Sequence, residues 1–449
     1  MKKIFQYIML AVVTIVMASC TSDIEETTTT TGKSNVQLVV GEFPAFGDSQ
    51  TRAIGIPDEG KTSWAEGDEL LLEIDNTSYG RHNATFTYNG KSWELTSGEL
   101  VYLEGAPAYI SHVYYAPNYK WSNTSLMLKK GKVAGTDELI EGEARITGNG
   151  ETITVSFAEA TRKYSRLRIA TLPNEQITVD TEYFTPAGSS DMEQNGNYTL
   201  TSDEKGNAYL YGTFENNSEV TVKYREAALT TYTFSQATES AKSYALDATV
   251  ISANSAEEIK SAIEQKVADG KTTIRLNLAP NAGTNEFMAI REAIKGAAPN
   301  DLGTIELTII GVETIPEEAF YKMLQLKSVR MSDVKEIKKY AFKECQYLTV
   351  VEAPSLNKLC SGAFKKCDQL AKLTFGPINY ADERNWPIFE YITPNIDLIL
   401  SDYQKEMIET DSYLYTANND RDYAGSDEHN SKNFLGREFR SITCRYKVK

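Results

Sequence analysis

The sequence predicts a mainly β protein, in which two N-terminal antiparallel β-sandwich domains precede a short repeat solenoid with a helical N-terminal cap. Apolar and polar residues alternate between positions 35 and 250, which is typical of half-buried strands. Three copies of a 22-residue unit then follow between positions 312 and 377, and such a period is typical of solenoids. Finally, Ser255 and Glu258 form a capping box before an amphipathic run that ends at Gly270, which predicts the cap helix.

Composition and charge exclude several kinds of partner. The chain has 449 residues and a formal net charge of −16. Such a charge repels nucleic acid and anionic membrane surfaces, and no basic run offsets it. Five cysteines are too few for a disulfide scaffold of this length. We therefore expect no nucleic-acid partner.

The N-terminus predicts export. Lys2 and Lys3 precede an apolar stretch that is too short for an ordinary membrane span, and a Met-Ala-Ser-Cys sequence ends at Cys20. This pattern resembles a bacterial lipoprotein signal, which implies removal of residues 1–19 and lipid attachment at Cys20. The alternative is an ordinary signal peptide with a coincidental cysteine. Residues 20–34 form a polar, threonine-rich tether.

The cellular location follows from the same segment. Acidic residues soon after Cys20 resemble the export tag of surface lipoproteins of the Bacteroides group, although a solvated linker would have the same composition. We expect an outer-membrane lipoprotein that is held by its lipid anchor and exposed at the cell surface.

The alternating region is large for one sandwich, so we expect two, at residues 35–160 and 161–250. Within the first, Asn89-Gly90 separates two alternating runs and predicts a two-residue hairpin turn. Gly67-Asp68 predicts a turn into the apolar strand that begins near Leu70, with Trp64 packed at its start.

Two short motifs resemble the N-terminal region of fimbrillin-like proteins of the Bacteroides group. They are Thr-Arg-Ala around Arg52 and Thr-Ser-Trp-Ala-Glu-Gly-Asp-Glu-Leu at residues 62–70. The resemblance implies two β-sandwich domains and proteolytic removal of a strand after a basic residue. A strand from a neighbouring fimbrial subunit then pairs with the open sheet edge. Arg52 is the candidate processing site, and an ordinary loop arginine is the alternative.

The second half is built on the repeat. Ala-Phe pairs end at Phe320, Phe342 and Phe364, and further apolar columns keep the same spacing. Each unit has an Ile-x-x-x-Ala-Phe-x-x-Cys-x-x-Leu pattern, which resembles the leucine-rich repeats of BspA-like surface proteins. Degenerate strands at 274–278 and 396–400 extend the series, so residues 251–449 are expected to form one domain with caps.

Sequence patterns offer no catalytic constellation, and we expect no enzyme, cofactor or metal. The three histidines, His82, His112 and His429, have no ligand at metal-binding spacing. Cys345 and Cys367 share one repeat column and are expected to be small buried hydrophobes. The same reasoning leaves open whether Cys444 is free or bonded to Cys360.

The outward face of the repeat strands is the candidate binding surface. Side chains alternate along a strand, so inward Val329 and Met331 predict outward neighbours. The alternative is a merely solvated sheet face. By repeat register, the predicted outward residues are Glu306, Thr308, Ser328, Arg330, Glu352, Lys372 and Thr374.

Three functions fit these observations. The first is an adhesin-like role, in which the repeat binds a host or bacterial surface protein. The second is a minor or tip fimbrial subunit that assembles by strand exchange. The third is a glycan-handling lipoprotein.

Overall fold

The computed structural model describes most of the chain, and the described residues form two compact units. The first unit contains the described residues up to Tyr164 together with Ser240–Lys242, and the second contains those from Ser165 to Glu239 and from Ser243 onward. Cys20 and Arg52 lie outside the described residues, so their predicted roles stay predictions. The described residues are 37–48, 61–76, 80–98, 108–123, 125–147, 152–157, 162–253, 255–381, 387–392, 394–401, 433–435 and 437–446.

Seven strands of the first unit form one sheet in the order β1-β10-β9-β6-β3-β4-β5. Neighbours pair antiparallel, except that β1 runs parallel to β10. A two-stranded hairpin, β7–β8, stands beside this sheet path. The strands are β1 (Gln37–Val40), β2 (Gly47–Asp48), β3 (Glu69–Asn76), β4 (Gly80–Tyr88), β5 (Trp93–Gly98), β6 (Ala108–Tyr115), β7 (Tyr119–Ser122), β8 (Ser125–Leu128), β9 (Ile140–Thr147) and β10 (Thr152–Ser156).

The predicted turn at Gly67 and the packing of Trp64 are confirmed. Gly67 has a φ of +92°, a conformation that costs a glycine little, and it delivers the chain into β3. The Trp64 ring then packs edge-on against Trp93 and Tyr115, with ring centroids 5.2 and 5.3 Å away.

The β4–β5 hairpin is confirmed, but its predicted two-residue turn is wrong. Tyr88 pairs with Trp93, so four residues make the connection. The Asn89 side chain explains the longer loop, because its Oδ1 accepts hydrogen bonds from the backbone N–H groups of Lys91 and Ser92 at 2.9 and 2.7 Å.

The second unit begins with another sheet, in the order β16-β15-β12-β14-β11-β17, with β13 paired to β12. Its pairings are antiparallel except for β11 with β17, which is parallel. The mainly β class is confirmed, whereas a two-layer sandwich stays a prediction for both regions. The strands are β11 (Ser165–Ala170), β12 (Gln176–Pro186), β13 (Glu193–Thr201), β14 (Asn207–Phe214), β15 (Glu219–Tyr224), β16 (Ala227–Thr233) and β17 (Lys242–Asp247).

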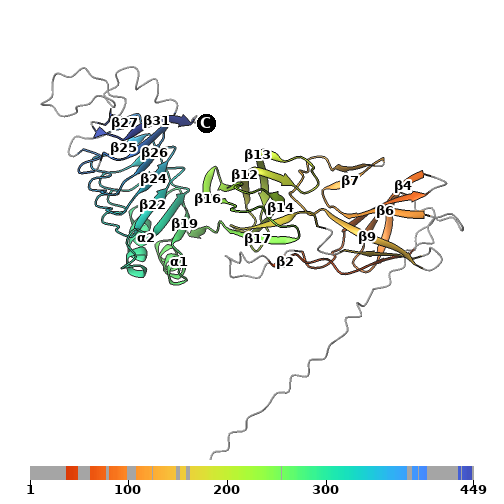
Figure 1. Ribbon diagram of the computed structural model, residues 1–449. Helices are drawn as coiled ribbons and strands as arrows, with labels where there is room; N and C mark the ends of the chain where they lie inside the picture. Colours follow the sequence, from red (N-terminus) through yellow and green to blue (C-terminus); the bar gives the residue numbers. More distant parts are fainter. Residues whose placement is uncertain are drawn as a thin grey trace, which may run out of the picture. The chain divides into compact units, whose positions relative to one another are not determined.

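The repeat region forms an eight-stranded sheet in which every pairing is parallel. Figure 1 shows these strands side by side, with both helices at the β19 end. The order follows the sequence: β18 (Ile251–Ala253), β19 (Thr273–Leu278), β20 (Ile305–Ile310), β22 (Leu326–Arg330), β24 (Val350–Ala353), β26 (Lys372–Phe375), β28 (Asp397–Ser401) and β31 (Ser441–Tyr446).

A narrower parallel sheet runs along another edge of the same repeats, in the order β21-β23-β25-β27. Its two-residue strands are β21 (Thr314–Ile315), β23 (Glu336–Ile337), β25 (Lys358–Leu359) and β27 (Tyr380–Ala381). A small hairpin pairs β29 (Asn433–Phe434) with β30 (Arg437–Glu438).

Helix α1 (Ala256–Ala268) is the predicted cap helix, and Ser255 Oγ accepts a hydrogen bond from the backbone N–H of Glu258 at 3.2 Å. The expected helix-like insert is α2 (Thr284–Ala297). Its Phe287 ring meets the first repeat phenylalanine, Phe320, at 5.6 Å.

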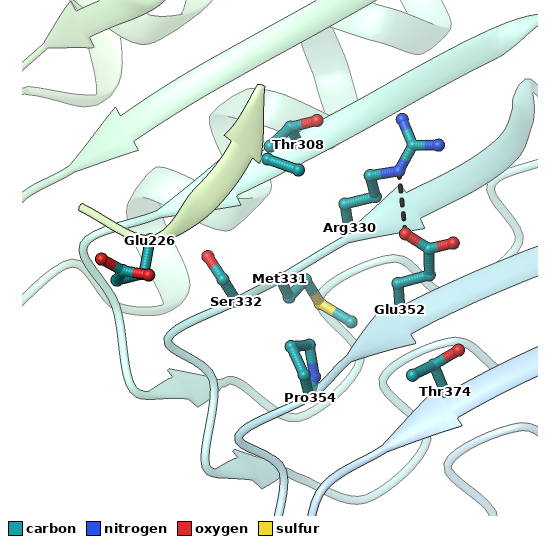
Figure 2. A pocket seen from close by; sticks show the side chains of 9 residues that line it. Glu226, Thr308, Arg330, Met331, Ser332, Glu352, Pro354 and Thr374 are labelled. Carbon is teal, nitrogen blue, oxygen red and sulfur yellow. Dashed lines mark hydrogen bonds and ion pairs between the residues drawn. The ribbon is translucent and has the colours of Figure 1, made fainter. Parts of the chain in front are cut away.

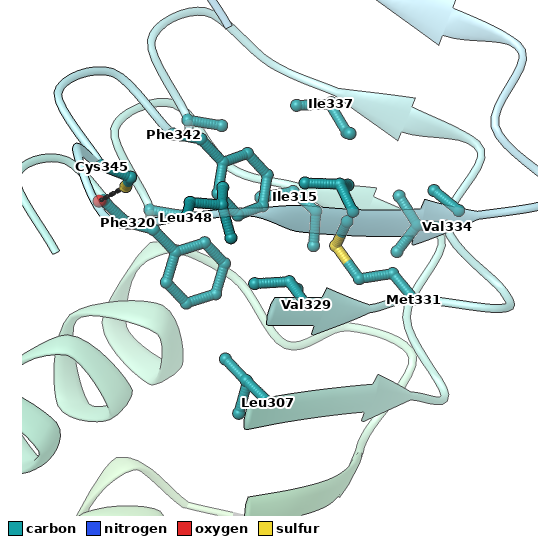
Figure 3. Packing of buried hydrophobic residues seen from close by; sticks show 14 of the residues in the cluster. Leu307, Ile315, Phe320, Val329, Met331, Val334, Ile337, Phe342, Cys345 and Leu348 are labelled. Atoms are coloured by element: carbon teal, nitrogen blue, oxygen red, sulfur yellow. Dashed lines mark hydrogen bonds between the residues drawn. The ribbon is translucent and has the colours of Figure 1, made fainter. Parts of the chain in front are cut away.

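A ladder of stacked rings runs through the core of the repeats. Phe320, Phe342 and Phe364 stack at centroid distances of 5.1 and 5.3 Å, and Phe389 continues the stack 5.7 Å further on. Figure 3 shows Phe320 and Phe342 among the aliphatic side chains of neighbouring rungs. The 22-residue period therefore places identical side chains on top of one another.

The predicted burial of the repeat cysteines is confirmed. Cys345 and Cys367 are fully buried, and their Sγ atoms donate to the carbonyls of Phe320 and Phe342 at 2.9 and 3.0 Å. No disulfide joins Cys360 and Cys444, which are both partly buried.

Candidate interaction surface on the repeat sheet

The strand register sets two outward columns across the repeat sheet. Inward Leu307, Val329, Val351 and Leu373 lie between them and are fully buried. The first column contains Thr273, Glu306, Ser328, Val350, Lys372, Asp397 and Ser441, and the second contains Arg275, Thr308, Arg330, Glu352, Thr374, Ile399 and Thr443.

All seven predicted surface residues belong to these two columns, but two of them are not accessible. Thr308 is 4% exposed and Ser328 is 9% exposed, so little of either side chain is accessible, and their role in binding stays a prediction. Thr308 lines a cavity beneath the β15–β16 hairpin, and Ser328 lies between longer neighbours in its column. The partly exposed residues are Glu306, Arg330, Glu352, Lys372 and Thr374.

Charges on this face pair with one another across the rungs. Glu352 lies at the centre, because one of its carboxylate oxygens accepts from Arg330 Nε at 2.9 Å and the other lies 3.7 Å from Lys372 Nζ. At the α2 side, Lys327 lies 2.8 Å from Glu306. Near the C-terminus, Arg440 pairs with Asp397. These contacts hold the long side chains in defined positions.

The hairpin between β15 and β16 covers one end of the face. Its two turn residues, Arg225 and Glu226, have φ values of 48° and 68°, a left-handed conformation that is strained outside glycine. Beyond the turn, the Leu229 carbonyl accepts a hydrogen bond from Arg275 Nε at 2.6 Å. Asp247 lies 3.9 Å from the same guanidinium. The hairpin is therefore fixed to the first rungs of the repeat.

These contacts also shift two pKa values. Burial lowers the pKa of the Arg275 guanidinium, and Asp247 opposes that effect. Burial alone would raise the pKa of Asp247, but hydrogen bonds from Thr249 and the charge of Arg275 hold it below its usual value. Both groups are thus charged near neutral pH, and the partly buried pair is maintained.

A cavity of about 320 Å³ lies where the hairpin meets the sheet. Figure 2 shows Glu226 on one side and Arg330 with Glu352 on the other, above Met331 and Pro354. The hydroxyls of Thr308, Ser332 and Thr374 add neutral donors and acceptors, and Ser332 Oγ is buried without a hydrogen-bond partner. A cavity at the small end of the range for ligand pockets can admit one polar side chain.

Sequence reasoning missed the hairpin residues and Ser332. Glu226 lies 104 positions before Arg330, and no period connects it to the repeat strands. The only local signal for Ser332 was its place two residues after Arg330 on the same side of the strand.

The histidines and the other possible metal ligands lie outside the repeat sheet or outside the described residues, or do not form a cluster. Among the residues that the structure describes, no group of three or more His, Cys, Asp or Glu side chains could hold a metal ion. His112 Nδ1 lies 3.3 Å from Glu141 Oε1 on the first-unit sheet, and His429 lies outside the described residues. No helix within the described ranges is long and apolar enough to cross a membrane.

Comparison with known proteins identifies the repeat. Residues 301–404 match the BspA type Leucine rich repeat region in six copies, so this part of the chain is such a region, as its sequence pattern predicts. The crystal structure of the T. pallidum Leucine Rich Repeat protein is also similar, at 18% identity and a TM-score of 0.17. That match covers 21% of this chain and 58% of the T. pallidum chain. No curated protein matches, and the fimbrillin resemblance of the first half stays a prediction.

Proposed function

We propose that this chain is an adhesin-like, lipid-anchored outer-membrane protein that binds a protein partner on the outward face of its repeat sheet and catalyses no reaction. Leucine-rich repeats generally mediate protein–protein interactions. The observation that carries the proposal is the row of ion-paired, partly exposed side chains around Glu352, with a small polar cavity beside it.

The charges of this face indicate what kind of partner it fits. Lys327, Arg330, Lys372 and Arg440 supply four cations, against three anions from Glu306, Glu352 and Asp397. The face is thus close to neutral, although the whole chain has a net charge of −16. A protein surface of mixed charge complements it better than a uniformly charged polymer does.

Site-specific photo-crosslinking in cells of the native organism tests the binding face. A photoreactive residue at Lys372 is expected to give one discrete adduct. The same residue at Lys335, which is 53% exposed on another edge, is the matched control and is expected to give none. Adding Arg330→Glu should abolish the Lys372 adduct, because it places two carboxylates together. Identical adducts from both positions, or none from Lys372, Arg330 or Thr374, would contradict the proposal.

The location is tested separately by protease treatment of intact cells. Release of the 251–449 segment supports an exterior position for the repeat. Protection in intact cells, with cleavage in lysed cells, would place it in the periplasm and exclude an adhesin.

A fimbrial subunit is the second candidate, and β1 favours it. This strand has four residues and, within the described part of the chain, it is the end strand of its sheet and pairs with β10. It also precedes Arg52, the candidate cleavage site. N-terminal sequencing of the protein from cells checks this candidate: a mature chain that begins at Ala53 and forms ladders of oligomers supports it, whereas a chain that begins at Cys20 contradicts it.

A further inference from the structure

Lysines and tyrosines alternate along the turn segments of the repeat, away from the sheet face. Lys343 Nζ lies 5.1 Å from the ring centroid of Tyr321 and 4.7 Å from that of Tyr340. Lys322 lies 5.1 Å from the Tyr321 ring, and Lys339 lies 4.8 Å from the Tyr340 ring. The five side chains therefore form a continuous row in which three ammonium groups alternate with two rings, and we call it the lysine row.

The repeat period builds this row. Tyr321 and Lys343 are one period apart, and the backbone N–H of Lys322 donates to the Lys343 carbonyl at 3.0 Å, which joins the two rungs. Successive rungs are separated by roughly 4.8 Å. On the next rung, a Cβ added to Gly362 would lie 2.5 Å from Tyr340 Cε1, so only glycine leaves room for that ring.

Helix α2 adds two cations beside the row. Arg291 Nη1 donates to the Glu318 carbonyl at 2.9 Å, and Lys295 Nζ donates to the Tyr321 carbonyl at 3.3 Å. Burial lowers the pKa of Lys295, and the charges of Arg291 and Lys322 lower it further. These cations are thus close enough to repel one another.

Little negative charge offsets this cluster. Within the described part of the chain, Glu344 is the one carboxylate within ion-pair distance of these five cations, at 3.5 Å from Lys322 and 4.0 Å from Lys343. Lys322 is 55% exposed, so its ammonium is available to a ligand. Mutually repelling cations with one shared carboxylate form a site that an added anion stabilises.

We propose that the lysine row binds a polysaccharide that carries sulfate or phosphate ester groups. A lysine ammonium is a compact charge with three donors, and it binds a tetrahedral oxyanion without the planar geometry that arginine imposes. In such a polymer, sugar rings separate the anionic groups. In the lysine row, tyrosine rings separate the ammonium groups in the same way. Nucleic acid fits less well, because ammonium groups already lie over Tyr321 and Tyr340, where bases would stack.

Affinity measurements with the full-length mature protein test the proposal. The probes are a fluorescent heparin oligosaccharide for sulfate and a phosphomannan for phosphate, each titrated at several salt concentrations. Polyglutamate and a single-stranded oligonucleotide of equal charge are the comparison polymers. The test variant is Lys322→Gln/Lys339→Gln/Lys343→Gln. Its matched control, Lys271→Gln/Lys335→Gln/Lys358→Gln, removes three lysines with exposed side chains that lie outside the lysine row and the sheet face.

We expect at least one saccharide probe to bind, and the one that does identifies the anion. The test variant should bind about tenfold or more weakly. The slope of log affinity against log salt concentration should also be smaller by roughly 2 to 3, since each lost contact with an anionic group lowers that slope by about 0.7–0.9. The control should bind like the unchanged protein. Circular dichroism should show both variants folded. Failure of both saccharides to bind at low salt, equal loss in the control, or tighter binding of polyglutamate or the oligonucleotide would overturn the proposal.

Discussion

Replacing Phe342 with alanine should strongly destabilise the repeat. Phe342 is fully buried, and its ring stacks between Phe320 and Phe364 at 5.1 and 5.3 Å. Truncating such a phenylalanine costs about 3–5 kcal/mol through lost burial and the cavity that remains. In a repeat array each rung contacts only its neighbours, so a defect in a central rung weakens the rungs on both sides.

Thiol reactivity provides a local assay for this effect. Cys345 and Cys367 are fully buried beside the ring ladder, so they react with a thiol reagent only when the repeat opens. Opening of the repeat therefore sets the rate of the slow phase of the thiol reaction. If Phe342→Ala lowers the stability of the repeat by about 3–5 kcal/mol, this slow phase should accelerate by roughly 10² to 10³·⁵-fold, because about 1.4 kcal/mol is a factor of ten. Three of the four tryptophans lie in the first unit, so their fluorescence should report an unchanged unfolding transition there.

The control is Phe342→Leu, which keeps most of the buried volume and should cost only about 1.5 kcal/mol. The reasoning would be refuted by an alanine variant whose slow thiol phase changes by less than about tenfold, or by equal effects of leucine and alanine. Either result would mean that the ring stack contributes little to closing the repeat.

Three further predictions follow from buried or capping groups. Arg162 is 1% exposed and lies 2.7 Å from Glu138, so Arg162→Met should cost about 3–5 kcal/mol in the tryptophan-monitored urea transition, because it removes the cation that pairs with a buried carboxylate. Ser255→Ala should cost roughly 1 kcal/mol in urea unfolding followed by circular dichroism, since α1 loses its N-cap. Burial raises the pKa of the Cys345 thiol to about 12, above its ordinary value. The contribution of this thiol to the free energy of unfolding is therefore complete below pH ~9, and it falls by about 1.4 kcal/mol per pH unit as the pH rises towards 12. Urea midpoints at pH 8 and 10 should therefore differ less in Cys345→Ser than in the unchanged protein.

The repeat could be predicted from sequence because its period repeats the same local requirements. Every 22 residues the chain needs a phenylalanine, a small residue and two apolar strand positions, and a register error would expose all of them. The pairing of Val329 with Val351 and of Val351 with Leu373 follows from that period alone. By the same reasoning the two outward columns could be assigned before their structure was known.

Contacts between segments that lie far apart in the sequence could not be predicted in this way. Nothing in the sequence around Arg225 and Glu226 predicts a tight turn, because neither residue is a glycine or asparagine. The burial of Thr308 depends on where that hairpin packs, which is a property of the tertiary structure. A similar limit applies to the β4–β5 turn, where hydrogen bonds of the Asn89 side chain favour a four-residue loop over the expected shorter one.

The net charge of the chain is a poor guide to its repeat domain. In parallel repeats, equivalent positions of successive units are neighbours in space, so one column can consist mostly of cations while another consists of ion pairs. At the sheet face, Glu352 pairs with both Arg330 and Lys372 across three rungs. Along the turn segments, Lys322 and Lys343 share the single carboxylate of Glu344. A chain with a net charge of −16 can therefore present one neutral surface for a protein and one basic surface for an anionic polymer. Because the two surfaces occupy different columns of the same rungs, substitutions in one should leave binding at the other intact.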